Sequence, residues 1–146
     1  MTKEFYSLKE MEEYYDEKTH SYAFKEDDNY IDLVIFNFKL NIKANIIAWD
    51  IVTYDDITAN DLYVGNIRAW HIKANNIYAG DINAKDIIAG NINAWSIEAE
   101  NIKAKNISYF TVCFAHQNIE CKSIKGRRKN SKHFVLDGTL EVLEDE

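Results

Sequence analysis

The side chains most capable of chemistry in this sequence are four histidines and two cysteines, and their spacing decides whether they could bind a metal or act in catalysis. Cys113 and His116 have the spacing of a ligand pair. A structural zinc site needs four ligands, and no second pair with matching spacing is present in the sequence. His71 occupies a position that elsewhere holds Asn or Asp, which indicates a polar turn residue and not a catalytic base. We therefore expect neither a metal nor a cofactor.

The remaining charged motifs also favour structural roles. The carboxylate pair Asp55–Asp56 has the residue types of an acid–base couple but lies where a sequence repeat slips, so we interpret both residues as turn residues. The sequence contains no nucleophile elbow, glycine-rich phosphate loop or HExxH motif. A basic run at 127–132 could contact phosphates, but no basic stripe accompanies it on this acidic chain, so we interpret it as a solvated loop. These features predict a protein that is not an enzyme and does not bind nucleic acid directly.

Composition limits the class further. The 146 residues fit one domain with a continuous core. The chain lacks proline and has only five glycines, so Asn and Asp must make its turns. The first ten residues contain no apolar run typical of a signal peptide, and no stretch approaches the roughly 20 apolar residues that span a membrane. We expect a cytoplasmic protein with reduced cysteines and no membrane partner.

A repeat of five residues occupies the middle of the chain. A large aliphatic residue recurs at every fifth position from Ile57 to Ile107 without a break. A small residue, alanine in nearly every unit, follows it by two positions, and Asn, Asp, His or Ser stands immediately before it. The pattern extends with slips: residues 41–44 form a unit, residues 111–114 keep the register with bulkier side chains, and residues 118–126 resume it.

This period excludes a helix and predicts short strands. Five residues advance about 140° around a helix, so the large residues would spiral over its whole surface. On a strand, residues two apart share a face, so the large and small residues of each unit both point inward. Asn and Asp tolerate the backbone of a tight corner, and isoleucine is β-branched as strands prefer. The sequence therefore predicts stacked coils about 4.8 Å apart, each pairing with the next.

These units resemble the pentapeptide-repeat family over roughly residues 41–126. The family places its small residue two positions before the large one, whereas here it comes two after. The resemblance implies a right-handed quadrilateral β-helix with twenty residues per coil. A three-sided coil of fifteen residues is the alternative, supported by echoes such as Tyr63 and Tyr78 or Gly65 and Gly80.

The flanking segments predict caps at both ends of an all-β, pentapeptide-type solenoid. Residues 1–40 form the N-terminal cap: Ser7 to Glu10 is a capping-box pattern opening a short helix to about Asp16. Strands follow at 22–24 and 30–40, around an acidic turn. Residues 127–146 form the C-terminal cap, a basic loop and then a β-hairpin, because Asp137-Gly138 between apolar strands favours a type I′ turn.

The candidate surface for a partner combines acidic and aromatic residues. Residues 1–40 carry ten acids against five bases, whereas residues 41–112 carry eight against six. Outward positions of the repeat hold large aromatics, the residues that protein interfaces favour. The candidate partner residues are Glu10, Glu12, Glu13, Asp16, Glu17, Glu26, Asp27, Asp28, Trp49, Tyr63, Trp70, Tyr78 and Trp95.

Two hypotheses for function follow. The first is a non-enzymatic, protein-binding solenoid of phage or bacterial type. It would act as an inhibitor or decoy, a partial DNA mimic, on a bacterial nucleic-acid-binding enzyme such as a topoisomerase or a CRISPR-type nuclease, as an anti-CRISPR protein does. The second is a structural β-solenoid scaffold that self-associates, either as a homodimer or as a polymer.

Overall fold

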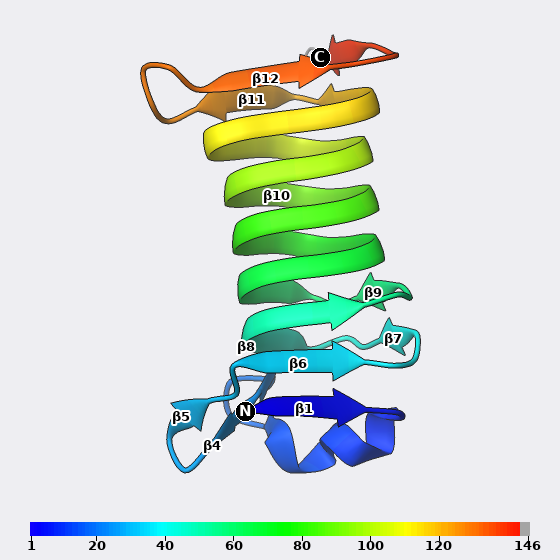
Figure 1. Cartoon of the computed structure of the whole chain (residues 1–146), viewed down its shortest axis with the longest axis vertical. Coiled ribbons are helices and arrows are strands. Elements are labelled where there is room, and N and C mark those ends of the chain that lie inside the picture. Colours follow the sequence, from blue (N-terminus) through cyan, green and yellow to red (C-terminus); the bar gives the residue numbers. More distant parts are fainter. Residues whose placement is uncertain (144–146) are drawn as a thin grey trace.

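The computed structural model describes residues 1–143 and shows a parallel β-solenoid of about six turns (Figure 1). One continuous coil, β10 (Asp61–Cys121), supplies the central turns. The all-β solenoid expected from the repeat is confirmed. No helix in this part of the chain has the length and apolarity needed to cross a membrane.

Each central turn of the solenoid contains fifteen residues in three walls, so the expected twenty-residue quadrilateral coil is wrong and the three-sided alternative is correct. Insertions at the corners lengthen the last turns, where Asn106 pairs with Ser123 and Val112 with Lys132. Ile72 lies directly beside Ile57 in parallel register. The backbone N–H of Asn75 donates to the carbonyl of Asn60 at 2.7 Å, again fifteen residues away. The physical reason is volume, because three walls enclose a narrow interior that isoleucine and alanine can fill at normal packing density.

Three parallel walls make up the solenoid, and each begins and ends with a short strand in register with the central coil. The first wall runs through β3 (Ser21–Ala23), the start of β8 (Asn45–Thr53), residues 62–64 and 106–109 of β10, and β11 (Ser123–Gly126). The second wall runs through β1 (Thr2–Phe5), β6 (Leu33–Phe36), the end of β8, residues 66–68 and 112–115 of β10, and β12 (Lys132–Val135). The third wall runs through β7 (Leu40–Asn41), β9 (Ile57–Thr58), residues 72–73 and 119–121 of β10, and β13 (Leu140–Val142).

The core consists of the inward columns that the repeat predicts. The large aliphatic residues from Ile57 to Ile107 are all buried, and Tyr109 replaces alanine in the last strict unit with only 1% of its surface exposed. The register then slips by one residue, because Cys113 is fully buried while Val112 is only half-buried. The expectation that residues 111–114 keep the register is therefore wrong. Cys121 occupies an alanine position and is buried as expected.

The N-terminal end is closed by aromatic and aliphatic side chains. A 3₁₀ helix, η1 (Leu8–Tyr14), lies below β1 in Figure 1 and stands where the sequence predicts a longer helix. Ser7 makes no side-chain capping bond, so the predicted capping box does not form. Instead, the Glu10 carboxylate accepts a hydrogen bond from the backbone N–H of Tyr6 at 2.6 Å.

The acidic turn is a tight hairpin beside this end. β4 (Lys25–Glu26) and β5 (Asn29–Tyr30) pair antiparallel. Asp27 and Asp28 between them have φ angles of 49° and 67°, the left-handed conformation that aspartate tolerates. The single strand expected at 30–40 is divided into β5, β6 and β7, because the chain turns corners between them. A second antiparallel pair joins β2 (Tyr15–Asp16) to β3.

The predicted C-terminal hairpin is wrong. β12 and β13 do not pair with each other, and both lie parallel on β10 as the last coil. Gly138 does not have the positive φ of a type I′ turn. A Cβ there would lie 1.8 Å from the carbonyl oxygen of Gln117, so Gly138 is needed for close approach at a corner of the coil.

Candidate interaction surfaces

Most of the polar residues that precede the large aliphatic residues are hydrogen-bonded in ladders along the corners of the solenoid. Asn76 donates to the Asp61 carboxylate at 3.0 Å and accepts a bond at 2.8 Å from Asn91, which in turn accepts one from Asn106 at 2.8 Å. Each amide therefore satisfies its neighbour one coil away. These Asn and Asp side chains stabilise the corners, and residues 41–112 as a whole carry eight acids against six bases.

His71 belongs to one such ladder and lies between two carboxylates. Its Nδ1 is 3.0 Å from Asp56 Oδ1, and its Nε2 is 3.2 Å from Asp86 Oδ2. Asp56 Oδ1 is buried and has no described partner with hydrogen-bond geometry, so its 3.0 Å approach to Nδ1 is a close polar contact. His71 thus has the structural corner position that the sequence predicts.

The two thiols are buried inside the last turns of β10. Burial, and to a lesser degree the nearby Cys121, raises the pKa of Cys113 to about 12, and burial also raises the pKa of Cys121. Both are free cysteines that act as small apolar core residues. Within residues 1–143, no group of three or more His, Cys, Asp or Glu side chains is arranged to hold a metal ion.

Three of the candidate aromatic residues converge on one hollow in the first wall, which we call the aromatic hollow. Trp49, Tyr63 and Tyr78 line it together with Tyr30, and its volume is about 350 Å³. The Tyr63 and Tyr78 rings come from successive coils and stack at 5.1 Å between centroids, with 4° between their planes. Trp49 leaves 57% of its surface exposed at the edge of the hollow.

Tyr30 was not among the candidate residues, because it lies outside the repeat and the sequence gives no sign that the hairpin folds against the first wall. The hairpin β4–β5 carries it there, and Ile47 of β8 completes the apolar lining. Lys25 lies over the Tyr30 ring at 5.9 Å. The acidic turn Asp27–Asp28 belongs to the same hairpin, and Asp28 comes two residues before Tyr30 in the sequence.

The other candidate acids lie at the N-terminal end. Glu10, Glu12, Glu13, Asp16, Glu17, Asp27 and Asp28 are exposed. Glu26 is partly buried, and its carboxylate accepts a hydrogen bond from the Tyr14 hydroxyl at 2.9 Å. Burial and this bond raise the pKa of Tyr14 to about 12. Glu26 therefore has a structural contact, as do Glu10, which accepts from Tyr6, and Asp16, which accepts from the backbone N–H of Lys18 at 2.9 Å.

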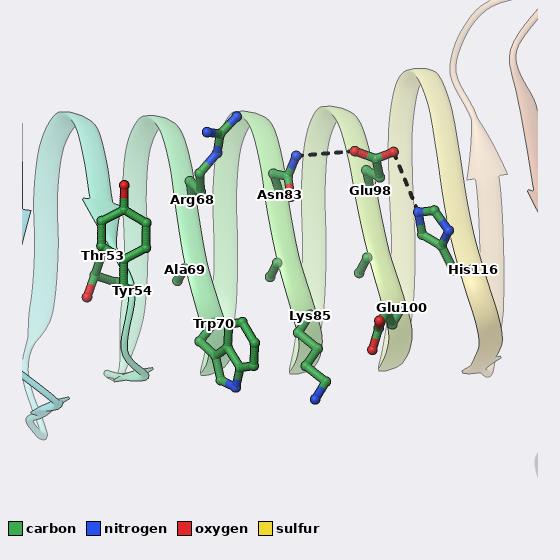
Figure 2. Close-up of a pocket in the computed structure, with 12 residues that line it drawn as sticks. Thr53, Tyr54, Arg68, Ala69, Trp70, Asn83, Lys85, Glu98, Glu100 and His116 are labelled. Atoms are coloured by element: carbon green, nitrogen blue, oxygen red, sulfur yellow. Dashed lines mark hydrogen bonds and ion pairs between the residues drawn. The ribbon is translucent and has the colours of Figure 1, made fainter.

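A second hollow, of about 450 Å³, lies between the second and third walls and contains Trp70 (Figure 2). Lys85 lies 4.9 Å above the Trp70 ring, and Arg68 extends from the neighbouring row of residues. In that row Asn83 donates to Glu98 at 3.2 Å, and Glu98 lies 3.7 Å from His116. The charges of this hollow are mixed, so it does not select a ligand of one sign.

Trp95 lies apart from both hollows and packs on Phe110 with 4.3 Å between ring centroids. The basic loop reaches the same place, because Arg127 and Arg128 lie 5.8 and 5.3 Å from the Phe110 ring. Arg127 also donates to the carbonyl of Ala94 at 2.6 Å. This part of the basic loop therefore packs on the solenoid, and the structure does not bring it near the acidic end.

Comparisons with models of protein families, with curated proteins and with solved structures find no match to this chain. The stacked parallel coils are consistent with a β-helix of the pentapeptide-repeat type.

Proposed function

We propose that this chain is a non-enzymatic, protein-binding solenoid whose partner surface is the aromatic hollow together with the acidic turn beside it. The proposal depends chiefly on one observation: aromatic side chains from three separate segments, at Tyr30, Trp49 and the Tyr63–Tyr78 pair, line a single exposed hollow. Exposed tryptophan and tyrosine are the side chains that contribute most to binding at protein interfaces.

Two of the aromatic rings that line the hollow contact each other and are anchored to the core, which favours binding. Tyr63 and Tyr78 stack, and each follows a fully buried residue of the core, Leu62 and Ile77. Side chains held in place before binding lose little conformational entropy when a partner docks. A preformed aromatic surface can therefore contribute more of its contact energy to affinity.

The partner that we propose carries basic groups. Asp27 and Asp28 are exposed in the hairpin that carries Tyr30 into the hollow, and residues 1–40 carry ten acids against five bases. A bacterial nucleic-acid-binding enzyme, such as a topoisomerase or a CRISPR-type nuclease, has a basic channel of complementary charge. The chain would inhibit such an enzyme by covering that channel. Any mimicry of DNA would be limited to the acidic end, because residues 41–112 carry eight acids against six bases and are close to neutral.

A pull-down from bacterial lysate with the immobilised full chain tests this proposal. We expect the wild type to retain a specific nucleic-acid-binding protein at low salt and to release it at high salt. The double variant Trp49→Ala/Tyr63→Ala should lose it. The double variant Asp27→Asn/Asp28→Asn should weaken its retention, while asparagine still tolerates the left-handed backbone of the turn.

Tyr54→Ala provides the matched control, because Tyr54 is 87% exposed and does not line the aromatic hollow. This variant should retain the partner as the wild type does. Recovery of no specific partner, or equal recovery with the Trp49→Ala/Tyr63→Ala variant, would exclude the proposed surface.

A further inference from the structure

The second wall carries two rows of outward side chains, and the central residues of these rows line the hollow in Figure 2. The first row, which we call the Arg68 row, consists of Val52, Arg68, Asn83, Glu98, Phe114 and Phe134. The second, which we call the Trp70 row, consists of Tyr54, Trp70, Lys85, Glu100, His116 and Leu136. Successive members of each row come from successive coils. Ala69, Ala84 and Ala99 line the floor between the rows.

The two rows are apolar at both ends and charged in the middle. Tyr54 at one end of the Trp70 row is 87% exposed, and Leu136 at its other end is 62% exposed. In the middle, Lys85 comes one coil before Glu100, and neither side chain forms an ion pair with any residue among 1–143. The wall therefore exposes apolar groups and opposite charges that its own chain does not pair.

We propose that the second wall binds the second wall of another copy of this chain, with the two solenoids antiparallel. The two-fold axis lies between the facing walls, runs along the strand direction and passes between the coil of Lys85 and the coil of Glu100. Rotation about this axis reverses the order of the coils and leaves each position along the strand unchanged. Each row therefore faces the same row of the second copy in reverse order, as an isologous contact requires.

At the axis, this arrangement brings opposite charges and hydrogen-bonding groups together. Lys85 of each copy faces Glu100 of the other, so two lysines and two glutamates form one cluster of alternating charge. Asn83 of each copy faces Glu98 of the other, whose carboxylate accepts a bond from Asn83 of its own chain at 3.2 Å and has room for a second donor. A network of several charges contributes more than an isolated surface pair.

One coil further from the axis, aromatic side chains meet polar or cationic ones. Trp70 is 51% exposed and faces His116 of the second copy. Arg68 faces Phe114, where its guanidinium can lie over the ring. Facing sheets pack about 10 Å apart, which is too close for two large side chains to meet end to end above a flat sheet. The hollow of about 450 Å³ gives the large side chains of the facing copy space to lie in.

At the two ends of the wall, apolar side chains face each other. Tyr54 faces Leu136 of the second copy, and Val52 faces Phe134, which is 47% exposed. Tyr54 is the most exposed of the large apolar residues among 1–143. Covering these groups removes apolar surface from water, which stabilises the association.

The other two walls do not combine these features in the part of the chain that the structure describes. The outward strand residues of the first wall at positions 63, 78, 93 and 108 are uncharged. On the third wall, Lys103 and Glu120 are opposite charges in adjacent coils, but an ion pair at 3.5 Å already joins them. Opposite charges left unpaired in adjacent coils of one row therefore favour the second wall as the contact.

Sedimentation equilibrium of the full chain and of charge-reversed variants tests the proposal. We expect the wild type to have twice the 17.0 kDa mass of the chain and to dissociate on dilution. Lys85→Glu and Glu100→Lys should each raise the dissociation constant at least about tenfold, because both central contacts become repulsive. An equimolar mixture of these two variants should form a dimer as the wild type does, since each variant supplies the charge that the other lacks. The double variant Lys85→Glu/Glu100→Lys should dimerise for the same reason.

Lys73→Glu is the matched control, because it makes the same change of charge at an exposed lysine of the third wall, and it should remain a dimer. A monomeric wild type, an equal loss of dimer with Lys73→Glu, or a mixture of Lys85→Glu and Glu100→Lys that stays monomeric would each overturn the proposal. The aromatic hollow lies on the first wall and stays open in this dimer, so its proposed function and the dimer can fail independently.

Discussion

Two adjacent isoleucines allow a direct test of which side chains form the interior. Ile87 is 1% exposed and Ile88 is 48% exposed, although they are neighbours in the same unit of the repeat. Replacing each by alanine makes the same chemical change on opposite faces of one strand. Differences in local sequence and in the unfolded chain are therefore small, and the comparison isolates burial.

The structure gives the expected magnitudes. Ile87→Ala removes three buried carbons, worth about 2.4 kcal/mol in transfer free energy at roughly 0.8 kcal/mol each. The cavity adds to this, so the total loss should be about 2–5 kcal/mol. Ile88→Ala removes the same atoms from a half-exposed site and leaves no cavity, so its cost should be about 1 kcal/mol or less.

Thermal unfolding followed by circular dichroism measures this difference. Ile87→Ala should lower the melting temperature by roughly 5–15 °C, and Ile88→Ala by less than about 4 °C. A one-residue error in the register would exchange the two faces of the strand. Equal effects, or a larger effect at Ile88, would therefore refute the assignment of inward and outward columns.

Three further outcomes are expected. Ala84→Leu should overpack the interior and cost about 1–3 kcal/mol, whereas Asn83→Leu on the outer face should cost little, as measured by urea denaturation; equal costs would contradict the wall geometry. His71→Leu should cost about 1–3 kcal/mol in the same assay because it removes the polar side chain that lies between the carboxylates of Asp56 and Asp86, and His71→Asn, which keeps a donor, should cost less. Burial raises the pKa of Cys113 from 9.0 to about 12, so above pH 9 the unfolded chain releases a proton that the folded chain keeps; stability should fall as pH rises from about 9 to 12, and less steeply in Cys113→Ala.

The repeat by itself determined the class of fold and the direction of most side chains. A period of five with large and small residues two apart is compatible with a strand and incompatible with a helix, so the inward columns could be assigned residue by residue. The corner role of His71 and the buried place of Cys121 followed from the same pattern. These predictions needed only the local period of the backbone.

The number of residues per coil depended on tertiary structure, because five-residue units are compatible with a coil of three walls or of four walls. Only packing across the interior selects three, the arrangement that the hydrogen bond between Asn75 and Asn60 reveals. Asp137-Gly138 has the local chemistry of a hairpin turn, yet pairing with the preceding coil makes it a corner. The aromatic hollow likewise forms only when the hairpin carrying Tyr30 folds against the first wall. Local sequence determines whether each side chain points inward or outward, whereas contacts between distant segments determine which side chains come together on one surface.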